Sequence, residues 1–565
     1  MTAASAGAES VWAAFERAAA ECTERDYLHV PLDACRAYSA EAITLRYGQA
    51  RERVSALAAA LRVAGYGAGH RVAIALDNRP EFFEYFLALN ALGASIVPLN
   101  AAMSGKELNF ALDHSDAALL VTHADHAAHV RGSLPAAVPL HVTRTGPAAD
   151  ASSETLPPPR KAAAAERGEA ALLYTSGTTG KPKGCILTNG YFIEAGRLYT
   201  SLGGYCRFDG VEDRLATPLP VTHMNALAVS FMAMLETRGC LIQLDRFHPS
   251  TWWQSLRASR ATAFHYLGVM PAMLLKAPPV RGETLQGRLR FGFGAGVDPR
   301  HHAAFEARFG VPLIEAWAMT ETGAGAWITA NEEPRHVGER CFGKAPRGVA
   351  YRIADEAGID VAPGAVGELL VRREGADPRR GFFSGYYKDT RATDEAWAGG
   401  WFHTGDLVRV GADGAFFFVD RSKNVVRRSG ENIAAVEVES VLGTHSDVAG
   451  SAVCPVGDEM RGEEVFAFVV LRPGAAPTLE TASALQAHCL EALAYYKAPG
   501  YVAFRAELPQ TASQKLARGE IKALAEALAA QTLAAQTPAA GSGSTGEPRA
   551  AGRAFDLRHL KKRRD

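Results

Sequence analysis

The chain has 565 residues, of which 48% are hydrophobic and 21% are charged, and this composition is ordinary for a globular enzyme. Its formal net charge of −1 provides no global field to attract nucleic acid or an anionic membrane, so an anionic ligand must be held by a local site. No segment approaches the roughly 20 apolar residues that span a bilayer, and no secretory signal is visible. We therefore expect a cytoplasmic protein with no membrane span and no nucleic-acid partner.

The first half of the sequence alternates between apolar strand-like runs and amphipathic helical patterns. Residues 71–77 and 95–99 predict strands, and residues 80–93 predict a helix that begins at a proline. The same alternation returns between residues 240 and 309. Such alternation predicts parallel sheets covered by helices, with ligands near the carboxyl ends of the strands.

Short strands separated by Gly, Asp and Pro turns predict antiparallel structure from about residue 343, and a small α+β unit follows from about residue 424. The predicted fold is α/β, with a large N-terminal domain of parallel sheets, a small antiparallel β subdomain, and a mobile α+β C-terminal domain. The predicted domains are residues 1–422 with the ATP and acid sites, residues 423–530 with a hinge at 423, and a flexible linker and basic tail at residues 531–565.

The eight cysteines are widely spaced, and none forms a CxxC pair. This spacing predicts reduced, mostly buried thiols and argues against a disulfide framework or a zinc site built from thiolates.

A loop rich in glycine and hydroxyl groups follows the apolar strand at residues 170–174. Its glycines let the backbone approach an anion closely, its hydroxyls donate hydrogen bonds, and its lysines add positive charge. The loop departs from the common P-loop because Gly180-Lys181 precedes Pro182, which disfavours a kinase or a motor-type NTPase. The predicted phosphate-binding residues are Thr175, Ser176, Gly177, Thr178, Thr179, Gly180 and Lys183.

Four further motifs follow in order: Trp-Ala-Met-Thr-Glu at 317–321, Thr-Gly-Asp at 404–406, Asp-Arg-Ser-Lys at 420–423, and Gln-Lys at 514–515. With the Lys-Pro-Lys-Gly end of the loop, they resemble the signature of the adenylate-forming superfamily of acyl-CoA synthetases, adenylation domains and firefly-type luciferases. The resemblance spans about residues 25–530 and is nearest to the crotonobetaine/carnitine-CoA ligase-like branch, whose members vary in substrate. It implies an AMP-forming acid–CoA ligase that uses ATP, Mg²⁺ and CoA.

The resemblance also assigns roles around the nucleotide. Trp317 is expected to pack on the adenine, Thr320 to contact a phosphate, and Glu321 to hold Mg²⁺, a hard ion that prefers oxygen ligands. Asp406 is expected to accept hydrogen bonds from the ribose hydroxyls, and Arg421 to make a second ribose or phosphate contact.

Three residues are expected, by the same resemblance, to serve the two steps of the reaction. Lys515 is the predicted adenylation residue, because its ammonium group offsets the repulsion between the carboxylate and the α-phosphate. Lys423 is the predicted hinge, and the backbone of Gly430 is expected to line the pantetheine tunnel in the second conformation. Ala318, Ser429 and Gln514 stand where relatives usually carry glycine.

The acid pocket is predicted around His223, which either orients the carboxylate or packs in the core, with Asn225 beside it. Gly294, Ala295 and Gly296 resemble the glycine turn along the acyl chain, and His265 is expected on the far wall. These polar groups favour a small or functionalised acid.

Three other functions remain open at this stage: an adenylating enzyme that passes its acyl group to a carrier protein or to oxygen, a non-catalytic nucleotide-binding homologue, and a phosphoryl-transferring kinase. The expected partners are small molecules, namely a carboxylic acid, ATP and CoA, and a homodimer is a possible assembly.

Overall fold

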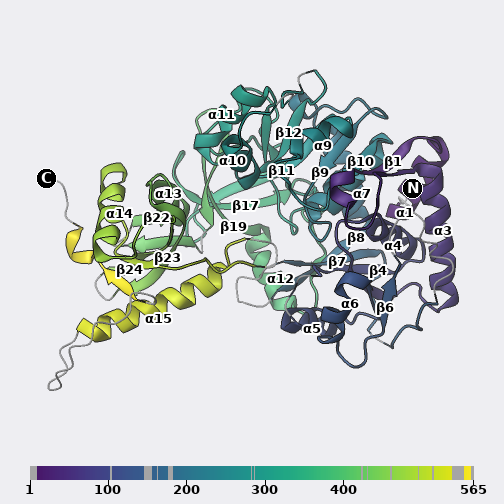
Figure 1. Cartoon of the computed structure of the whole chain (residues 1–565), viewed down its shortest axis with the longest axis horizontal. Coiled ribbons are helices and arrows are strands. Elements are labelled where there is room, and N and C mark those ends of the chain that lie inside the picture. The colour runs from purple at the N-terminus through teal and green to yellow at the C-terminus, as the bar shows by residue number, and fades with distance from the viewer. Residues whose placement is uncertain are drawn as a thin grey trace.

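Four β-sheets organise the chain, three in a large part that ends at Arg421 and one in a smaller part that begins at Val425 (Figure 1). The computed structural model describes residues 9–101, 103, 105–144, 155–161, 163–175, 182–280, 283–285, 287–421, 424–428, 431–458, 461–493, 495–511, 515–536 and 553–561. Among these residues, no helix is both long and apolar enough to cross a membrane.

A seven-stranded sheet runs in the order β18-β8-β7-β4-β3-β5-β6. Strands β7, β4, β3, β5 and β6 are parallel, whereas β7 and β8 form an antiparallel hairpin. Strands β3 and β5 are buried throughout, as expected of parallel strands covered on both faces. The elements are β3 (Arg71–Ala75), β4 (Ser95–Pro98), β5 (Leu119–His123), β6 (Leu140–Thr143), β7 (Glu169–Thr175), β8 (Lys183–Thr188), β18 (Gly385–Tyr386), α4 (Pro80–Ala91), α5 (Gly105–His114) and α6 (Ala124–Arg131).

An eight-stranded sheet runs in the order β14-β13-β12-β11-β9-β10-β1-β2 and is parallel except at its two edges. Its strands are β1 (Asp26–Val30), β2 (Ile43–Arg46), β9 (Arg214–Thr217), β10 (Cys240–Gln243), β11 (Ala263–Leu267), β12 (Phe291–Ala295), β13 (Leu313–Trp317) and β14 (Ile328–Thr329). The helices of this region are α1 (Val11–Glu21), α2 (Leu32–Cys35), α3 (Tyr47–Val63), α7 (Asn189–Ser201), η2 (Gly204–Cys206), α9 (Trp252–Ala258), α10 (Val269–Lys276) and α11 (Pro299–Phe309).

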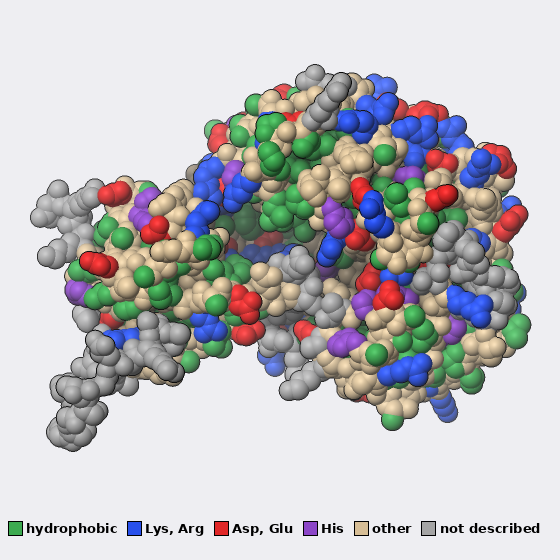
Figure 2. All heavy atoms as spheres, in the orientation of Figure 1, with side chains coloured by type: hydrophobic (Ala, Val, Ile, Leu, Met, Phe, Trp, Pro, Cys, Tyr) green, Lys and Arg blue, Asp and Glu red, His purple; other side chains and the backbone are tan. Residues whose placement is uncertain are grey.

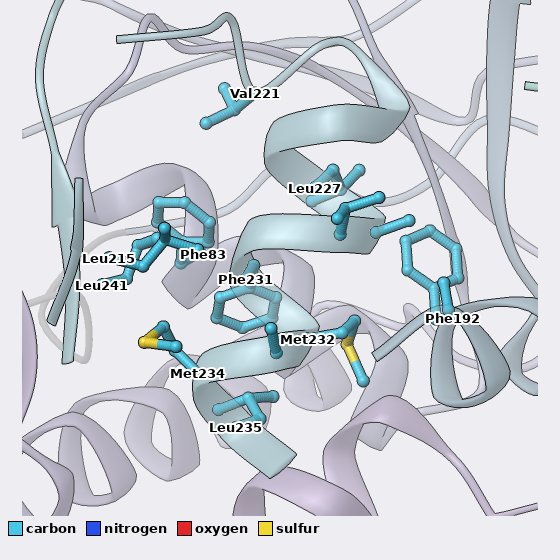
Figure 3. Packing of buried hydrophobic residues seen from close by; sticks show 14 of the residues in the cluster. Phe83, Phe192, Leu215, Val221, Leu227, Phe231, Met232, Met234, Leu235 and Leu241 are labelled. Carbon is cyan, nitrogen blue, oxygen red and sulfur yellow. The ribbon is translucent and has the colours of Figure 1, made fainter. Parts of the chain in front are cut away.

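One helical segment occupies the core of the large part. It begins as a π-helical turn, η3 (Asn225–Ser230), and continues as α8 (Phe231–Thr237). Figure 3 shows its apolar side chains packed among residues of α4, α7, β9 and β10. The Phe231 ring lies 4.9 Å from that of Phe83. Because π-helical turns are rare and often mark functional sites, a core element that begins at Asn225 is a notable scaffold for the predicted acid pocket.

A five-stranded antiparallel sheet, ordered β15-β20-β19-β17-β16, forms the predicted β subdomain. Its elements are β15 (Cys341–Gly343), β16 (Val349–Ala354), β17 (Gly367–Arg373), β19 (Phe402–Val410), β20 (Phe416–Arg421), α12 (Thr390–Ala396) and η4 (Ala398–Gly400).

The smaller part has its own apolar core and a sheet in which β22, β21, β24, β25 and β26 follow one another, with β23 paired to β24. Its elements are β21 (Val425–Arg428), β22 (Glu431–Ala434), β23 (Val448–Asp458), β24 (Gly462–Leu471), β25 (Tyr501–Phe504), β26 (Ala554–Asp556), α13 (Ala435–Leu442), α14 (Leu479–Ala492), α15 (Arg518–Gln536) and η6 (Arg558–Leu560). The predicted α/β fold class is confirmed. All eight cysteines are free, and all but Cys22 are buried.

The described end of the chain differs from the expected flexible tail. Helix α15 continues to Gln536, and residues 554–556 form strand β26, antiparallel to β25. Lys561 is buried, and its Nζ lies 2.6 Å from Glu464 Oε1, while Arg428 binds the other carboxylate oxygen at 2.9 Å. Burial lowers the pKa of Lys561 to about 8. The basic composition of this segment predicted a tail in contact with solvent. Composition does not reveal that one of its basic residues, Lys561, has the buried carboxylate of Glu464 as its partner.

We predict that Lys561→Met loosens the edge of the small sheet. Glu464 would lose one buried partner but keep Arg428, so the local cost should be roughly 1–3 kcal/mol. Amide hydrogen exchange at residues 501–504 should become faster. Lys522→Met, a change at a surface ion pair on α15, is the control, and equal exchange in both variants would contradict a tethering role for Lys561.

Candidate active site

The predicted phosphate end of the site lies where the β7–β8 hairpin meets the segment after β13. Thr175, the last residue of β7, donates a hydrogen bond from Oγ1 to Glu321 Oε1 at 3.3 Å, and the hydroxyl of Tyr386 donates to the same oxygen at 3.0 Å. The ammonium group of Lys183 lies 4.7 Å from the centre of the Tyr386 ring. The structure thus brings Glu321, which is distant in the sequence, to Thr175 and near Lys183, at the two ends of the predicted phosphate loop.

Thr320 is held next to them, because its carbonyl accepts a hydrogen bond from Tyr191 at 2.9 Å. The remaining predicted phosphate ligands, Ser176 to Gly180, lie outside the described residues, as do the predicted hinge residue Lys423 and tunnel residue Gly430.

The predicted ribose end of the site is organised by the pairing of β19 with β20. Their register places Asp406 opposite Arg421, and Arg421 Nε lies 2.9 Å from Asp406 Oδ1. The indole nitrogen of Trp317 donates to Asp406 Oδ2 at 2.8 Å. Burial raises the pKa of Asp406, and both partners oppose that rise by favouring the charged carboxylate.

Trp317 therefore has a role that the sequence did not predict. Its side chain is buried and orients Asp406, whereas the next residue, Ala318, is exposed. Packing of Trp317 on adenine stays a prediction.

The predicted acid end contains two histidines in different environments. His223 is half-buried in the loop between β9 and η3, where burial, and then the charge of Lys515, lower its pKa to about 4. His265 is fully buried in β11, with Nε2 2.8 Å from the Tyr199 hydroxyl and Nδ1 2.5 Å from Asn225 Oδ1. Since both of its ring nitrogens have protein partners, His265 supports Asn225 from behind.

The glycine turn follows β12, between the ends of β11 and β13. Gly296 has a positive φ of 80°, and Ala295 and Gly296 are both exposed. A Cβ at Gly294 would lie 2.3 Å from the carbonyl oxygen of Tyr266, so glycine is required there. Buried Glu315 holds the turn by accepting hydrogen bonds from the amides of Gly296 and Val297.

Lys515 reaches the same region from the smaller part. A tight turn supports it, because Lys515 N donates to Thr511 Oγ1 at 3.3 Å and its carbonyl accepts from Thr511 N at 2.7 Å. The side chain retains contact with solvent, yet partial loss of hydration and the nearby charge of Arg421 lower its pKa. The charge of Lys515 acts on His223 and that of Arg421 acts on Lys515, so the three side chains lie near one another. Figure 2 shows a hollow between the large part and the smaller part.

Sequence reasoning missed several supporting residues. Asp420 accepts hydrogen bonds from the amides of Arg421 and Val436, so it connects β20 of the large part with α13 of the small part. Tyr386 and Glu315 contact Glu321 and the glycine turn, respectively. Asp420 belongs to the Asp-Arg-Ser-Lys motif at residues 420–423, so the sequence could have indicated it. Nothing local in the sequence distinguishes Tyr386 or Glu315.

Comparison with known proteins agrees with this arrangement. The family model described as AMP-binding enzyme matches residues 15–387, and that of the AMP-binding enzyme C-terminal domain matches residues 437–515. A sulfoacetate–CoA ligase from Cupriavidus necator is 34% identical, covering 84% of this chain and 91% of that protein. A crotonobetaine/carnitine–CoA ligase from Citrobacter koseri is 29% identical, covering 84% and 92%. The crystal structure of ATP-bound MatB from Rhodopseudomonas palustris has a TM-score of 0.74 at 25% identity, covering 90% and 98%.

The chain belongs to the AMP-binding enzyme family. Within that family, the predicted class of enzyme, an AMP-forming acid–CoA ligase, is confirmed by these matches. These matches therefore do not support the alternatives of a non-catalytic homologue or a phosphoryl-transferring kinase.

We predict that His223 stays neutral from about pH 5 to about pH 8, because its pKa lies near 4, below the usual value of 6.5. Between about pH 4 and pH 6.5, the folded and the ordinary pKa of His223, the unfolded chain binds more protons at this residue than the folded chain does. His223 therefore contributes to a loss of stability as the pH falls through this range. His223→Gln should lower the rate of adenylation without changing the shape of its pH profile over that interval. A resonance of His223 that titrates near pH 6.5 in the NMR spectrum would refute the assignment.

Proposed function

We propose that this enzyme activates a small, polar carboxylic acid in the hollow between its two parts, with Lys515 serving the first half-reaction. The observation that supports this proposal is that Lys515 lies near enough to His223 and to Arg421 for charge to act between them, so it is within reach of one predicted acid residue and one predicted nucleotide residue.

In the first half-reaction, a carboxylate oxygen of the acid attacks the α-phosphorus of ATP, and the bond to the β-phosphate breaks. The products are acyl-AMP and pyrophosphate. Two anions must approach each other, and the ammonium group of Lys515 stabilises the charge that they share in the transition state.

In the second half-reaction, the sulfur of CoA attacks the acyl carbon, and the bond from that carbon to the AMP oxygen breaks. The thiol proton leaves to solvent, and AMP is released. We propose that the small part turns about Lys423, withdrawing Lys515 and bringing Gly430 towards the reacting sulfur, which is a hinge-type conformational step. The order of the motifs supports this assignment.

Mg²⁺ fits the donors at the phosphate end. Glu321 is a buried carboxylate beside Thr175 and the predicted phosphate loop, and carboxylate and phosphate oxygens are the ligands that this ion prefers. When bound, Mg²⁺ would neutralise phosphate charge, while Thr175 and Tyr386 orient Glu321 towards it.

The acid is proposed to carry a second polar or charged group. Asn225 and His223 place polar atoms at the predicted pocket, and the two relatives act, by their names, on sulfoacetate and on crotonobetaine or carnitine. The exposed Leu267 and Ala295, at the ends of β11 and β12, supply a short apolar wall. We further propose that the enzyme works in the cytoplasm, has no nucleic-acid partner and assembles as a homodimer.

A screen of carboxylic acids for CoA-dependent AMP formation tests the substrate class. Sulfoacetate, malonate and crotonobetaine represent small functionalised acids, and octanoate represents a plain alkyl acid. The proposal requires a clear preference for the first group. Acid-dependent exchange of pyrophosphate into ATP without thioester formation from CoA would instead favour a carrier-protein acceptor.

We predict that Lys515→Ala lowers the rate of adenylation by about 10²–10³-fold, because a preorganised charge at the transition state is lost. Thioester formation from preformed acyl-AMP should fall much less, since the lysine is proposed to have left the site. Pyrophosphate release and thioester formation are measured separately, and Lys522→Ala is the surface control. Equal losses in the two half-reactions would contradict the assigned role.

A further inference from the structure

Three side chains with metal-binding atoms converge at one edge of the seven-stranded sheet, apart from the nucleotide residues described above. Asp77 follows β3, His123 ends the neighbouring parallel strand β5, and His126 lies in the first turn of α6. One oxygen or nitrogen of each residue lies within 4.8 Å of the others. The parallel pairing of β3 with β5 is what brings these residues to the same edge.

The distances within this cluster are short. Asp77 Oδ2 lies 3.0 Å from His123 Nε2 and 2.8 Å from His126 Nε2, and the two imidazole rings are 4.4 Å apart at their centres. Tetrahedral zinc holds nitrogen and oxygen ligands at roughly 2.0–2.2 Å, which separates them from one another by about 3.3 Å. A small outward movement of the three side chains would therefore open a tetrahedral site.

Asp125 supplies the support that a metal-binding histidine needs. Its Oδ2 lies 3.3 Å from His123 Nδ1 and 2.9 Å from a guanidinium nitrogen of Arg79. Metal-bound histidines commonly donate their second ring N–H to a carboxylate, which fixes the ring orientation. Arg79, Asp125 and His123 follow one another in the order of such a chain, and the other ring nitrogen of His123, Nε2, faces Asp77.

A neutral His123 ring, which carries one N–H, cannot donate a hydrogen bond to both of the carboxylates that its nitrogens face. His123 is buried, and both of its nitrogens face carboxylate oxygens, yet Nδ1 has no hydrogen-bond partner of good geometry among the described residues. If Nε2 carries the proton, the lone pair of Nδ1 faces Asp125. A cation at Nε2 removes the conflict, because Nδ1–H can then point towards Asp125.

We propose that Asp77, His123 and His126 form a binding site for Zn²⁺. Two imidazole ligands favour zinc and its transition-metal neighbours over Mg²⁺ and Ca²⁺, which prefer oxygen. Asp77 and His126 are partly exposed, so the ion has an entry path, and a water completes the coordination.

The site would connect the metal to the loop that carries His223. Asn78, the residue after Asp77, donates from Nδ2 to the Leu219 carbonyl at 3.0 Å, and its Oδ1 accepts from Val221 N at 2.9 Å. Zinc held by Asp77 would therefore restrain Asn78 and, through it, the segment leading to the predicted acid pocket. The ion acts here as a clamp between β3, α6 and this loop, outside the reacting groups.

Calorimetric titration of the metal-free, untagged full-length chain with Zn²⁺ tests the site. We expect one tight site per chain in the wild-type protein, and binding at least tenfold weaker in Asp77→Asn and in His126→Gln. His129→Gln is the matched control, because His129 lies on the same helix and binds the carbonyl of Met103 instead. Asp125→Asn should weaken binding by about 10–100-fold through the orientation of His123.

Co²⁺ provides a second readout, because its visible absorption reports the ligands of the bound ion. Wild-type protein should show a band that is lost in His126→Gln and kept in His129→Gln. Melting in the presence of EDTA checks that each variant folds, and this test does not depend on finding the acid. The proposal is overturned if the wild-type chain binds no Zn²⁺ tightly, or if His126→Gln and Asp77→Asn bind it as well as the control does.

Discussion

The pairing of β19 with β20 is the constraint on which the candidate site depends most. Its register sets Asp406 opposite Arg421, and Asp406 in turn receives the indole of Trp317. One residue before Arg421, Asp420 binds the amide of Val436 in the small part. A single hairpin therefore orients the predicted ribose ligand and fixes where the small part begins.

Around this hairpin, the polar groups of the site are held by buried partners instead of by solvent. Glu315, His265 and Asp406 would each be costly to bury alone, and each is matched to hydrogen bonds that fix its direction. The groups left towards solvent, Lys515 and Arg421, are the ones that meet substrates in the proposed mechanism. Rigid support behind and charged groups in front is the arrangement expected of a preorganised site.

Much of the fold could be predicted from the sequence because its evidence is local. The strand–helix alternation at residues 71–93 follows from apolar spacing, and the structure agrees with it. The motifs likewise indicated Glu321, Asp406 and Lys515 as candidates. Partners distant in sequence were not predictable in this way: His265 was expected to line the pocket, yet its pairing with Tyr199 turns it into a support. The cluster at Asp77 escaped notice because its residues approach one another only when β3 pairs with β5.

The short strand β26 has a consequence for the edge of the small sheet. Without it, β25 would present an apolar, fully buried sequence at an open sheet edge, the kind of surface that recruits strands from other molecules. Strand β26 comes after β25 in the chain and covers this edge. A local opening of β26 would therefore expose the small part to pairing with other molecules and to aggregation.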